Sequence, residues 1–277
     1  MAAGRGDDVK IMSKVPLSPT VKLYLDHHEY RLCAALPWGK YLYQDEGSSV
    51  FVKVSSAETG MSLIRSEMKG LELLAPLIRN AVSVPEGTLL LDDSDGVILK
   101  MTRVNGVSSS KWFAARINLT PSLAKSQRTM SLANLLDKES TDNELAQFLI
   151  HRFGDVNLIV TPSHGDLIYW NVLVGSQRPG LVDFEYVSDG RVMGFDDLHY
   201  RLAPWLYRWM RWHLPMQLLV HWGRRQARTV CRKHDLLVQP ELLLALFFVH
   251  WAAIRREWHP DFQPQKIGRV ERWATLI

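Results

Sequence analysis

The chain has 277 residues and a formal net charge of +4, with 47% hydrophobic and 22% charged residues. This length and composition fit a globular protein with a large buried core and exclude a disordered or fibrous chain. Its two cysteines, Cys33 and Cys231, are far apart in the sequence, which excludes a disulfide framework and a cysteine-based zinc site and is typical of a reducing compartment.

Two further features of the sequence bear on location. The N-terminus has no apolar stretch of the kind found in signal peptides. The longest apolar run, residues 242–254, is interrupted by His250 and is too short to cross a bilayer. We therefore expect a soluble cytoplasmic protein.

The N-terminal part alternates between apolar and polar residues. This pattern predicts antiparallel strands at residues 30–36, 40–44 and 49–54. Pro37-Trp38-Gly39 is typical of the turn between the first two strands. Since Gly39 is the only glycine in that turn, a phosphate-binding loop and a plain hairpin both remain open.

A helix is predicted over residues 57–78, and one acidic residue lies on its apolar side. Leucine or isoleucine stands three and four positions before Glu67, and leucine stands four and seven positions after it. A buried carboxylate needs a cationic partner, and Lys53 in the third strand is the candidate. Alternatively, Lys53 faces solvent on the other side of the pleat. Glu72 is a second candidate partner, although it lies off the apolar stripe.

The middle of the chain contains both strands and helices. Between residues 108 and 154 the pattern is mostly helical, most clearly at 131–136 and 144–153. Thr141 and Glu144 have the spacing of a capping box. Further strands are predicted at residues 88–91, 96–104, 158–160, 172–174 and 181–183.

The most informative stretch is His164-Gly-Asp-Leu-Ile-Tyr-Trp-Asn171, followed twelve residues later by Asp183-Phe-Glu-Tyr. The Asp166 carboxylate can accept a proton from an attacking hydroxyl or orient it. Asn171 and Asp183 offer the oxygen ligands that Mg2+ needs when it bridges phosphates. Asp and Asn are also common in ordinary turns. The full set on short loops beside predicted strands favours Mg-ATP phosphotransfer.

These residues resemble the motif of the aminoglycoside phosphotransferase and choline kinase superfamily, whose members are distant relatives of protein kinases. The resemblance implies an α+β, protein-kinase-like bilobal fold that binds ATP in its cleft. We expect a small antiparallel-sheet N-lobe at residues 1–104 and a mainly helical C-lobe at residues 105–277. It also implies that Asp166 is the catalytic base and that Asn171 and Asp183 hold Mg2+.

The resemblance extends to the nucleotide. It implies that Lys53, positioned by Glu67, contacts the α- and β-phosphates of ATP. It also implies that the backbone from Met101 to Arg103, just before Asn105-Gly106, binds adenine at the hinge between the lobes.

A third marker, Gly194-Phe-Asp-Asp-Leu-His199, is similar to a pattern of choline and ethanolamine kinases. The resemblance implies that Asp196, or else Asp197, accepts hydrogen bonds from the backbone of the catalytic loop; either residue is also suited to cap the next helix. Glu185 has two interpretations, support of a second Mg2+ or a structural pair with an arginine. We expect His164 to be structural.

The sequence leaves the phosphate acceptor open. Residues 204–215 are rich in tryptophan and arginine and form either a packed helix, a wall of the acceptor pocket, or a patch that contacts anionic membrane lipid at the inner face of the membrane. With the positive net charge, they favour a glycan acceptor, including a lipopolysaccharide-type or lipid-linked sugar.

Two other acceptor classes and one other kind of function compete with the glycan. Choline or ethanolamine fits the Asp183-Phe-Glu-Tyr motif, but the expected glutamate is missing and Arg201 stands near its place. An aminoglycoside conflicts with the charge. A catalytically silent nucleotide-binding scaffold is the alternative outside enzymes. No nucleic-acid partner is expected, because no recognition motif is present.

Overall fold

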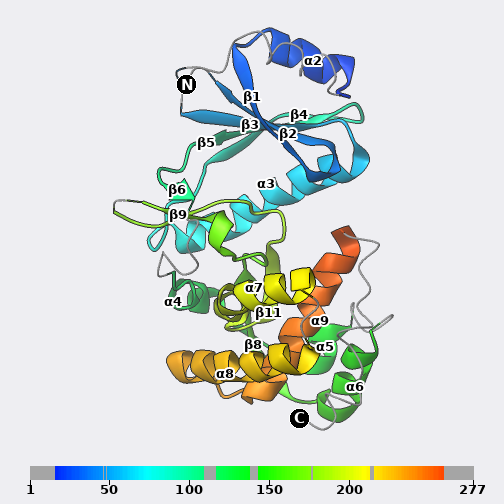
Figure 1. Ribbon diagram of the computed structural model, residues 1–277, viewed down its shortest axis with the longest axis vertical. Coiled ribbons are helices and arrows are strands. Elements are labelled where there is room, and N and C mark those ends of the chain that lie inside the picture. Colours follow the sequence, from blue (N-terminus) through cyan, green and yellow to red (C-terminus); the bar gives the residue numbers. More distant parts are fainter. Residues whose placement is uncertain are drawn as a thin grey trace.

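The computed structural model describes residues 16–45, 47, 49–108, 117–137, 143–175, 177–212 and 215–258. A five-stranded sheet with two helices forms the N-terminal lobe, and a larger, mainly helical lobe follows (Figure 1). The predicted α+β bilobal architecture is therefore confirmed. The boundary at residue 104 stays a prediction.

The N-lobe sheet has the strand order β1-β2-β3-β5-β4, and all neighbouring strands are antiparallel. Its strands are β1 (Tyr30–Leu36), β2 (Lys40–Asp45), β3 (Val50–Ser55), β4 (Gly87–Asp92) and β5 (Val97–Thr102). Lys53 pairs with Leu42 on one side and with Leu99 on the other. Since paired residues project from the same face of a sheet, these three side chains share one face.

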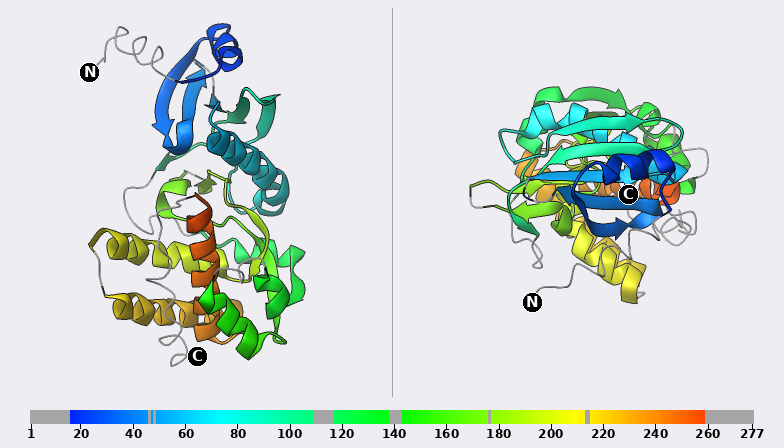
Figure 2. Two further views of the ribbon diagram at one scale, coloured as in Figure 1. Left: turned by 90° about the vertical axis from the view of Figure 1, so that its right-hand side faces the viewer. Right: turned by 90° about the horizontal axis from the view of Figure 1, so that it is seen from above.

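One helix covers each face of this sheet. Successive strand residues point to opposite faces, and both faces carry apolar side chains that the helices bury. Val52, Val54 and Ile98 pack against α2 (Pro19–Asp26), which lies at the end of the molecule farthest from the C-lobe (Figure 2). Leu99 on the other face packs with residues of α3 (Glu58–Ile78). The Lys53 face therefore looks towards α3 and the C-lobe.

Helix α2 was not predicted, although the sequence carries a signal for it. The Ser18 hydroxyl accepts a hydrogen bond from the Val21 N–H, and Pro19 occupies the first turn. Serine at the N-cap followed by proline is a typical helix start.

The C-lobe combines six helices with two small sheets among the described residues. The helices are α4 (Thr120–Leu123), α5 (Leu132–Leu136), α6 (Glu144–Phe153), α7 (Phe195–Trp212), α8 (Met216–His234) and α9 (Pro240–Trp258). The strands are β6 (Val107–Ser108), β7 (Arg128–Ser131), β8 (Asn157–Ser163), β9 (Val172–Val174), β10 (Gly180–Leu181) and β11 (Ser188–Val192). The sheet orders are β10-β9-β6 and β11-β8-β7.

Two details of the C-lobe differ from the prediction. Strands β6, β7 and β11 were not predicted. All three are short: β7 and β11 pair with the two edges of β8, and β6 pairs with β9. The capping box was wrong: Asn143 is the N-cap of α6, because its side-chain oxygen accepts from the N–H groups of Leu145 and Ala146. Thr141 lies outside the described residues.

Helix α9 forms the centre of the C-lobe core. Its residues from Leu242 to Ala252 are almost all fully buried, as expected for a helix that is apolar on every side. In the described part of the chain, no helix combines the length and apolar character needed to cross a membrane.

Candidate active site

The loop that carries Asp166 is held in place by Asp196. This loop joins β8 to a short 3-10 helix, η4 (Tyr169–Asn171). The buried Asp196 carboxylate accepts the His164 N–H at 2.7 Å and the Gly165 N–H at 3.0 Å. The predicted contact between Asp196 and the loop backbone is thus present, and Asp196 rather than Asp197 makes it.

The Asp166 side chain is oriented by two neighbours. The Asn171 amide nitrogen donates to the Asp166 backbone oxygen at 3.0 Å and to its carboxylate Oδ2 at 3.3 Å. His199, a buried residue, donates from Nδ1 to the Gly165 carbonyl at 3.1 Å, and its Nε2 lies 3.9 Å from Asp166 Oδ1. These contacts hold the Asp166 carboxylate in place. Asp166 also lines a cavity, which is described below.

His164 has a structural place, as predicted. Its ring is fully buried, and Nε2 donates to the Val182 carbonyl at 3.2 Å. Burial lowers the pKa of His164 to about 4, so the ring is neutral at pH 7. The neutral, buried ring links the loop that carries Asp166 to the segment before Asp183.

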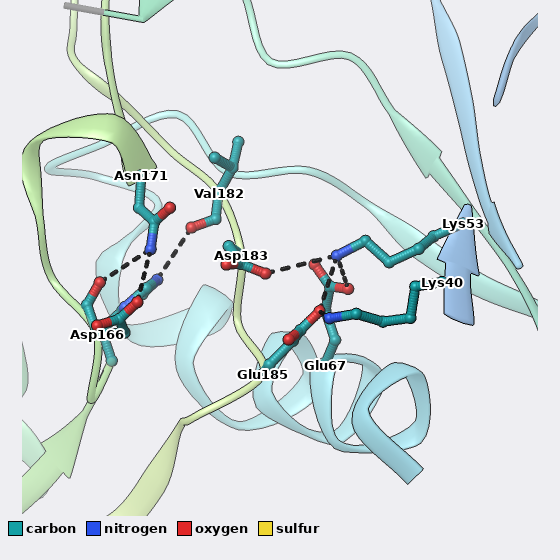
Figure 3. Close-up of polar contacts among 9 residues, drawn as sticks. Lys40, Lys53, Glu67, Asp166, Asn171, Val182, Asp183 and Glu185 are labelled. Atoms are coloured by element: carbon teal, nitrogen blue, oxygen red, sulfur yellow. Dashed lines mark hydrogen bonds and ion pairs between the residues drawn. The ribbon is translucent and has the colours of Figure 1, made fainter. Parts of the chain in front are cut away.

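Asp183 lies between two groups of polar side chains. In Figure 3, Asp166 and Asn171 lie on one side of it, and Lys53, Glu67 and Glu185 on the other. Its backbone has a left-handed φ of 67°. Such a conformation is uncommon for a residue other than glycine, and backbone strain of this kind is concentrated at functional sites.

The predicted ion pair between Lys53 and Glu67 is present. Lys53 Nζ lies 2.5 Å from Glu67 Oε2, and both side chains are buried between β3 and α3. Burial lowers the pKa of Lys53, but the nearby carboxylates of Glu67, Glu185 and Asp183 outweigh it and hold the pKa well above its ordinary value. Lys53 is therefore a permanent cation in this site, while Glu72 is exposed.

The structure adds a lysine that sequence reasoning missed. Lys40, the first residue of β2, is 4% exposed and forms an ion pair with Glu185 (Figure 3). Glu185 also accepts from Lys53 at 3.1 Å. The interpretation that Glu185 pairs with an arginine was wrong: its partners are Lys40 and Lys53. The turn before β2 brings Lys40 to Glu185. The signal was strand alternation, which puts Lys40 on the same face of β2 as Leu42.

A cavity of about 500 Å³ connects these groups. That volume falls in the range of small-molecule binding sites. Its charged lining residues are Lys40, Lys53, Glu67, Asp166, Asp183 and Glu185, and its aromatic ones are Trp38, Phe51, Trp170, Tyr186 and Tyr207.

The predicted adenine contact is only partly accessible. Met101 and Val104 line the cavity. Arg103 is exposed, and its backbone N–H already donates to the Ser49 carbonyl at 2.6 Å. Arg103 is not among the described residues that line the cavity, and of its two backbone hydrogen-bonding groups the N–H is already used. The adenine contact stays a prediction.

The donor set in the cavity fits a magnesium ion. Glu67, Asp183 and Glu185 each offer a carboxylate oxygen, and these oxygens lie within 4.8 Å of one another. Asn171 is not among the described residues that line the cavity, but its side-chain nitrogen donates to Asp166, which leaves its amide oxygen for a ligand. Carboxylate and amide oxygens are the hard donors that Mg2+ prefers, and Glu67 is the least suited because Lys53 occupies it.

The tryptophan- and arginine-rich segment packs mainly against other helices. Trp205 on α7 stacks on Trp222 of α8 with 4.6 Å between the ring centroids, and Trp209 packs on the C-lobe core. Arg201 pairs with Asp197 at 3.2 Å. Neither these tryptophans nor Arg201 are among the described residues that line the cavity. The interpretation as a packed helix is confirmed for Trp205 and Trp209. The aromatic residues that line the cavity are different ones, and they include Tyr207 of the same segment.

No protein-family model and no curated protein matches the chain by sequence. Solved structures match it in fold. A thermostable mutant of aminoglycoside phosphotransferase APH(4)-Ia in its apo form is 11% identical, with a TM-score of 0.55 over 93% of this chain and 98% of that chain. The ternary complex of a mutant of the same enzyme with AMP-PNP and hygromycin B gives 12% identity and a TM-score of 0.54, covering 98% of each chain.

A choline kinase has a similar likeness. LicA from Streptococcus pneumoniae is 15% identical, with a TM-score of 0.51 over 93% of this chain and 97% of that chain. Each of these matches covers nearly the whole of both chains, so the likeness includes both lobes. The chain therefore shares the protein-kinase-like fold of these aminoglycoside phosphotransferase and choline kinase structures.

Proposed function

We propose that this protein is an ATP- and Mg2+-dependent phosphotransferase that transfers the γ-phosphoryl group to a hydroxyl of a small molecule. One observation carries the proposal: the Lys53–Glu67 ion pair, Asp183 and Asp166 all line a single cavity. A cation held by a buried carboxylate, a metal-binding carboxylate and a base for the acceptor are the parts that phosphoryl transfer requires.

Each residue has a role that follows from its contacts. Lys53 neutralises phosphate charge and is kept in place by Glu67. Asp183 and Asn171 would hold Mg2+, and Glu185 would be a further carboxylate donor beside Asp183. When bound, Mg2+ neutralises charge that develops on the phosphate oxygens. Asp166 accepts the proton of the acceptor hydroxyl, whose oxygen forms the new bond to phosphorus as ADP leaves.

The aromatic side chains near Asp166 bear on the class of acceptor. Trp170 and Tyr207 meet edge to face with their ring centroids 4.4 Å apart, and both line the cavity together with Tyr186. Aromatic rings pack well against the apolar faces of sugars, and we propose a sugar hydroxyl as the acceptor. No arginine is present among the described lining residues, so the support for a phosphorylated sugar is lost.

Choline or ethanolamine remains the second candidate acceptor. The same aromatic side chains suit a quaternary ammonium through cation–π interactions. The objection from Arg201 is also removed, because this residue pairs with Asp197 and does not line the cavity. A direct comparison of choline with neutral sugars as acceptors separates the two candidates.

A lipid-linked or lipopolysaccharide-type sugar is a narrower form of the first candidate. Trp212 is 58% exposed and Leu218 49% exposed, and the exposed Arg225 lies on the same helix as Leu218. Exposed tryptophan, leucine and arginine side chains on these two helices, α7 and α8, suit the surface of an anionic membrane. If these side chains bind a membrane, less Trp212→Ala than wild-type protein will sediment with anionic vesicles. Neutral vesicles will bind neither protein.

The function is tested by transfer of labelled γ-phosphate from Mg-ATP to fractionated cell extract and to the candidate acceptors. Asp166→Asn should keep ATP binding and lose transfer, and Asp183→Ala should lose both transfer and slow ATP hydrolysis. Turnover like that of the wild type in either variant would contradict the assignment. ATP binding without label in any fraction would favour a regulatory scaffold.

A further inference from the structure

Lys40 is the one cation besides Lys53 among the described residues that line the cavity. It is buried, its ammonium group is paired with Glu185, and it lies 5.8 Å from the centroid of the Trp38 ring. A buried lysine needs an anionic partner. Glu185, however, already accepts from Lys53 at 3.1 Å, so the Lys40 ammonium is not required to neutralise it.

The shape of the first turn directs Lys40 into the cavity. Trp38 and Gly39 both have left-handed φ angles, of 60° and 68°. The Ser55 hydroxyl donates to the Gly39 carbonyl at 2.9 Å. Gly60 of α3 lacks a Cβ that would collide with the Trp38 carbonyl and the Ser55 side chain. The strained turn is therefore held against the start of α3, and Lys40 follows it directly.

Register then places the two lysines on one face of the sheet. Leu42 pairs with Lys53, and Lys40 is two residues before Leu42 on the same strand. Residues two apart on a strand project from the same face. Both ammonium groups reach the same carboxylate, Glu185, so they lie side by side at the end of the cavity where Asp183 is found (Figure 3).

The charge balance of the cavity calls for a second cation when a nucleotide binds. The two lysines face the four carboxylates of Glu67, Asp166, Asp183 and Glu185. A triphosphate adds further negative charge, and Lys53 stays engaged with Glu67. On the basis of the proposed phosphotransfer, we propose that Lys40 is a second phosphate-binding lysine, which Glu185 holds until the nucleotide displaces it.

The test is binding of Mg-ATP, Mg-ADP and adenosine to Lys40→Met, measured by calorimetry. The substitution keeps the aliphatic stem, and Glu185 retains Lys53, so we expect the variant to fold. Lys40→Arg restores the charge. Lys100→Met is the matched control, since Lys100 is exposed on β5 of the same sheet.

A direct ammonium–phosphate contact predicts a selective effect. Affinity for Mg-ATP should fall about tenfold or more in Lys40→Met, recover in Lys40→Arg and stay unchanged in Lys100→Met, with adenosine affinity the same in all four proteins. If adenosine and Mg-ATP affinity fall equally, Lys40 only supports the fold of the cleft and the inference is wrong. Wild-type affinity for Mg-ATP in Lys40→Met overturns this inference alone. A wild-type protein that binds no Mg-ATP overturns the proposed function as well.

Discussion

Replacing Asp196 with asparagine should loosen the catalytic loop more than it destabilises the protein. The Asp196 carboxylate accepts two backbone N–H groups, from His164 at 2.7 Å and Gly165 at 3.0 Å, and it is 5% exposed. Asparagine keeps one acceptor oxygen and turns an amide N–H2 towards the second N–H. One buried backbone donor is then left without a partner.

The magnitude follows from the lost bond. A hydrogen bond to a charged group contributes about 1.5–3 kcal/mol, and an unsatisfied buried donor costs about 1–3 kcal/mol; since these overlap, we expect a loss of about 2–4 kcal/mol in the free energy of unfolding. At about 2 °C per kcal/mol for a chain of this size, Tm should fall by roughly 4–8 °C. Local opening of the loop costs less free energy than unfolding of the whole protein, so the variant loop should open more often even where the protein stays folded. We therefore expect turnover to fall at temperatures well below Tm.

Asp197 is the matched control for this experiment. It is 6% exposed, but its partners are His234 at 2.9 Å, Lys233 at 3.0 Å and Arg201 at 3.2 Å, all outside the catalytic loop. Thermal denaturation, hydrogen–deuterium exchange over residues 160–175 and Mg-dependent ATP hydrolysis are measured for both asparagine variants. Faster loop exchange and lower hydrolysis in Asp196→Asn only is the expected result. Equal loop exchange in the two variants would refute the anchoring role.

Three further predictions concern other contacts. Glu67→Gln should weaken Mg-ATP binding by about tenfold or more, because Lys53 loses its nearest partner. Glu72 is exposed, so Glu72→Gln should bind Mg-ATP as the wild type does. Equal Mg-ATP affinity in the two variants would exclude a positioning role for Glu67. Gly165→Ala should abolish turnover and lower Tm, because Gly165 has a φ of +85° and a Cβ there would collide with the Tyr186 carbonyl; an unchanged Tm would contradict this. Burial raises the pKa of Asp197, but its pairs with His234, Arg201 and Lys233 outweigh burial and lower the pKa below its ordinary value of 3.8. The charged Asp197 therefore stabilises the fold above pH 3.8, and this stabilisation is lost as the pH falls through the folded-state pKa. The Tm difference between wild type and Asp197→Asn should therefore shrink below about pH 4, and a difference that grows in acid would show that the sign is wrong.

The sequence predicted the parts of the site that depend on local pattern. Helical periodicity put Glu67 on a buried face, and the rule that buried charges are paired then pointed to Lys53, at a separation of fourteen residues. The motif around Asp166 and Asn171 is also local, because five residues separate the two side chains that contact each other. Strand and helix positions in the N-lobe followed in the same way, except for α2.

Contacts between distant segments could not be predicted. Lys40 and Glu185 are 145 residues apart, and their meeting depends on the turn before β2 and on how the lobes close around the cavity. For this reason, one of the two interpretations of Glu185 named an arginine as its partner, where the structure has two lysines. The short strands β7 and β11 likewise exist only because β8 lies between them.

Helix α7 shows why composition alone could not decide between a packed helix and a wall of the acceptor pocket. Trp205 and Tyr207 are two residues apart, and a helix turns by about 200° over that distance, so their side chains point to opposite sides. Trp205 stacks on Trp222 of α8, whereas Tyr207 meets Trp170 in the cavity. The segment richest in tryptophan therefore stabilises helix packing through one face and contributes Tyr207 to the cavity through the other. Trp170 lies in η4, directly after the loop that carries Asp166, and it lines the same cavity as Asp166 and Tyr207. Under the proposed function, we expect the Trp170–Tyr207 pair, more than the tryptophan-rich face, to determine which hydroxyl reaches Asp166.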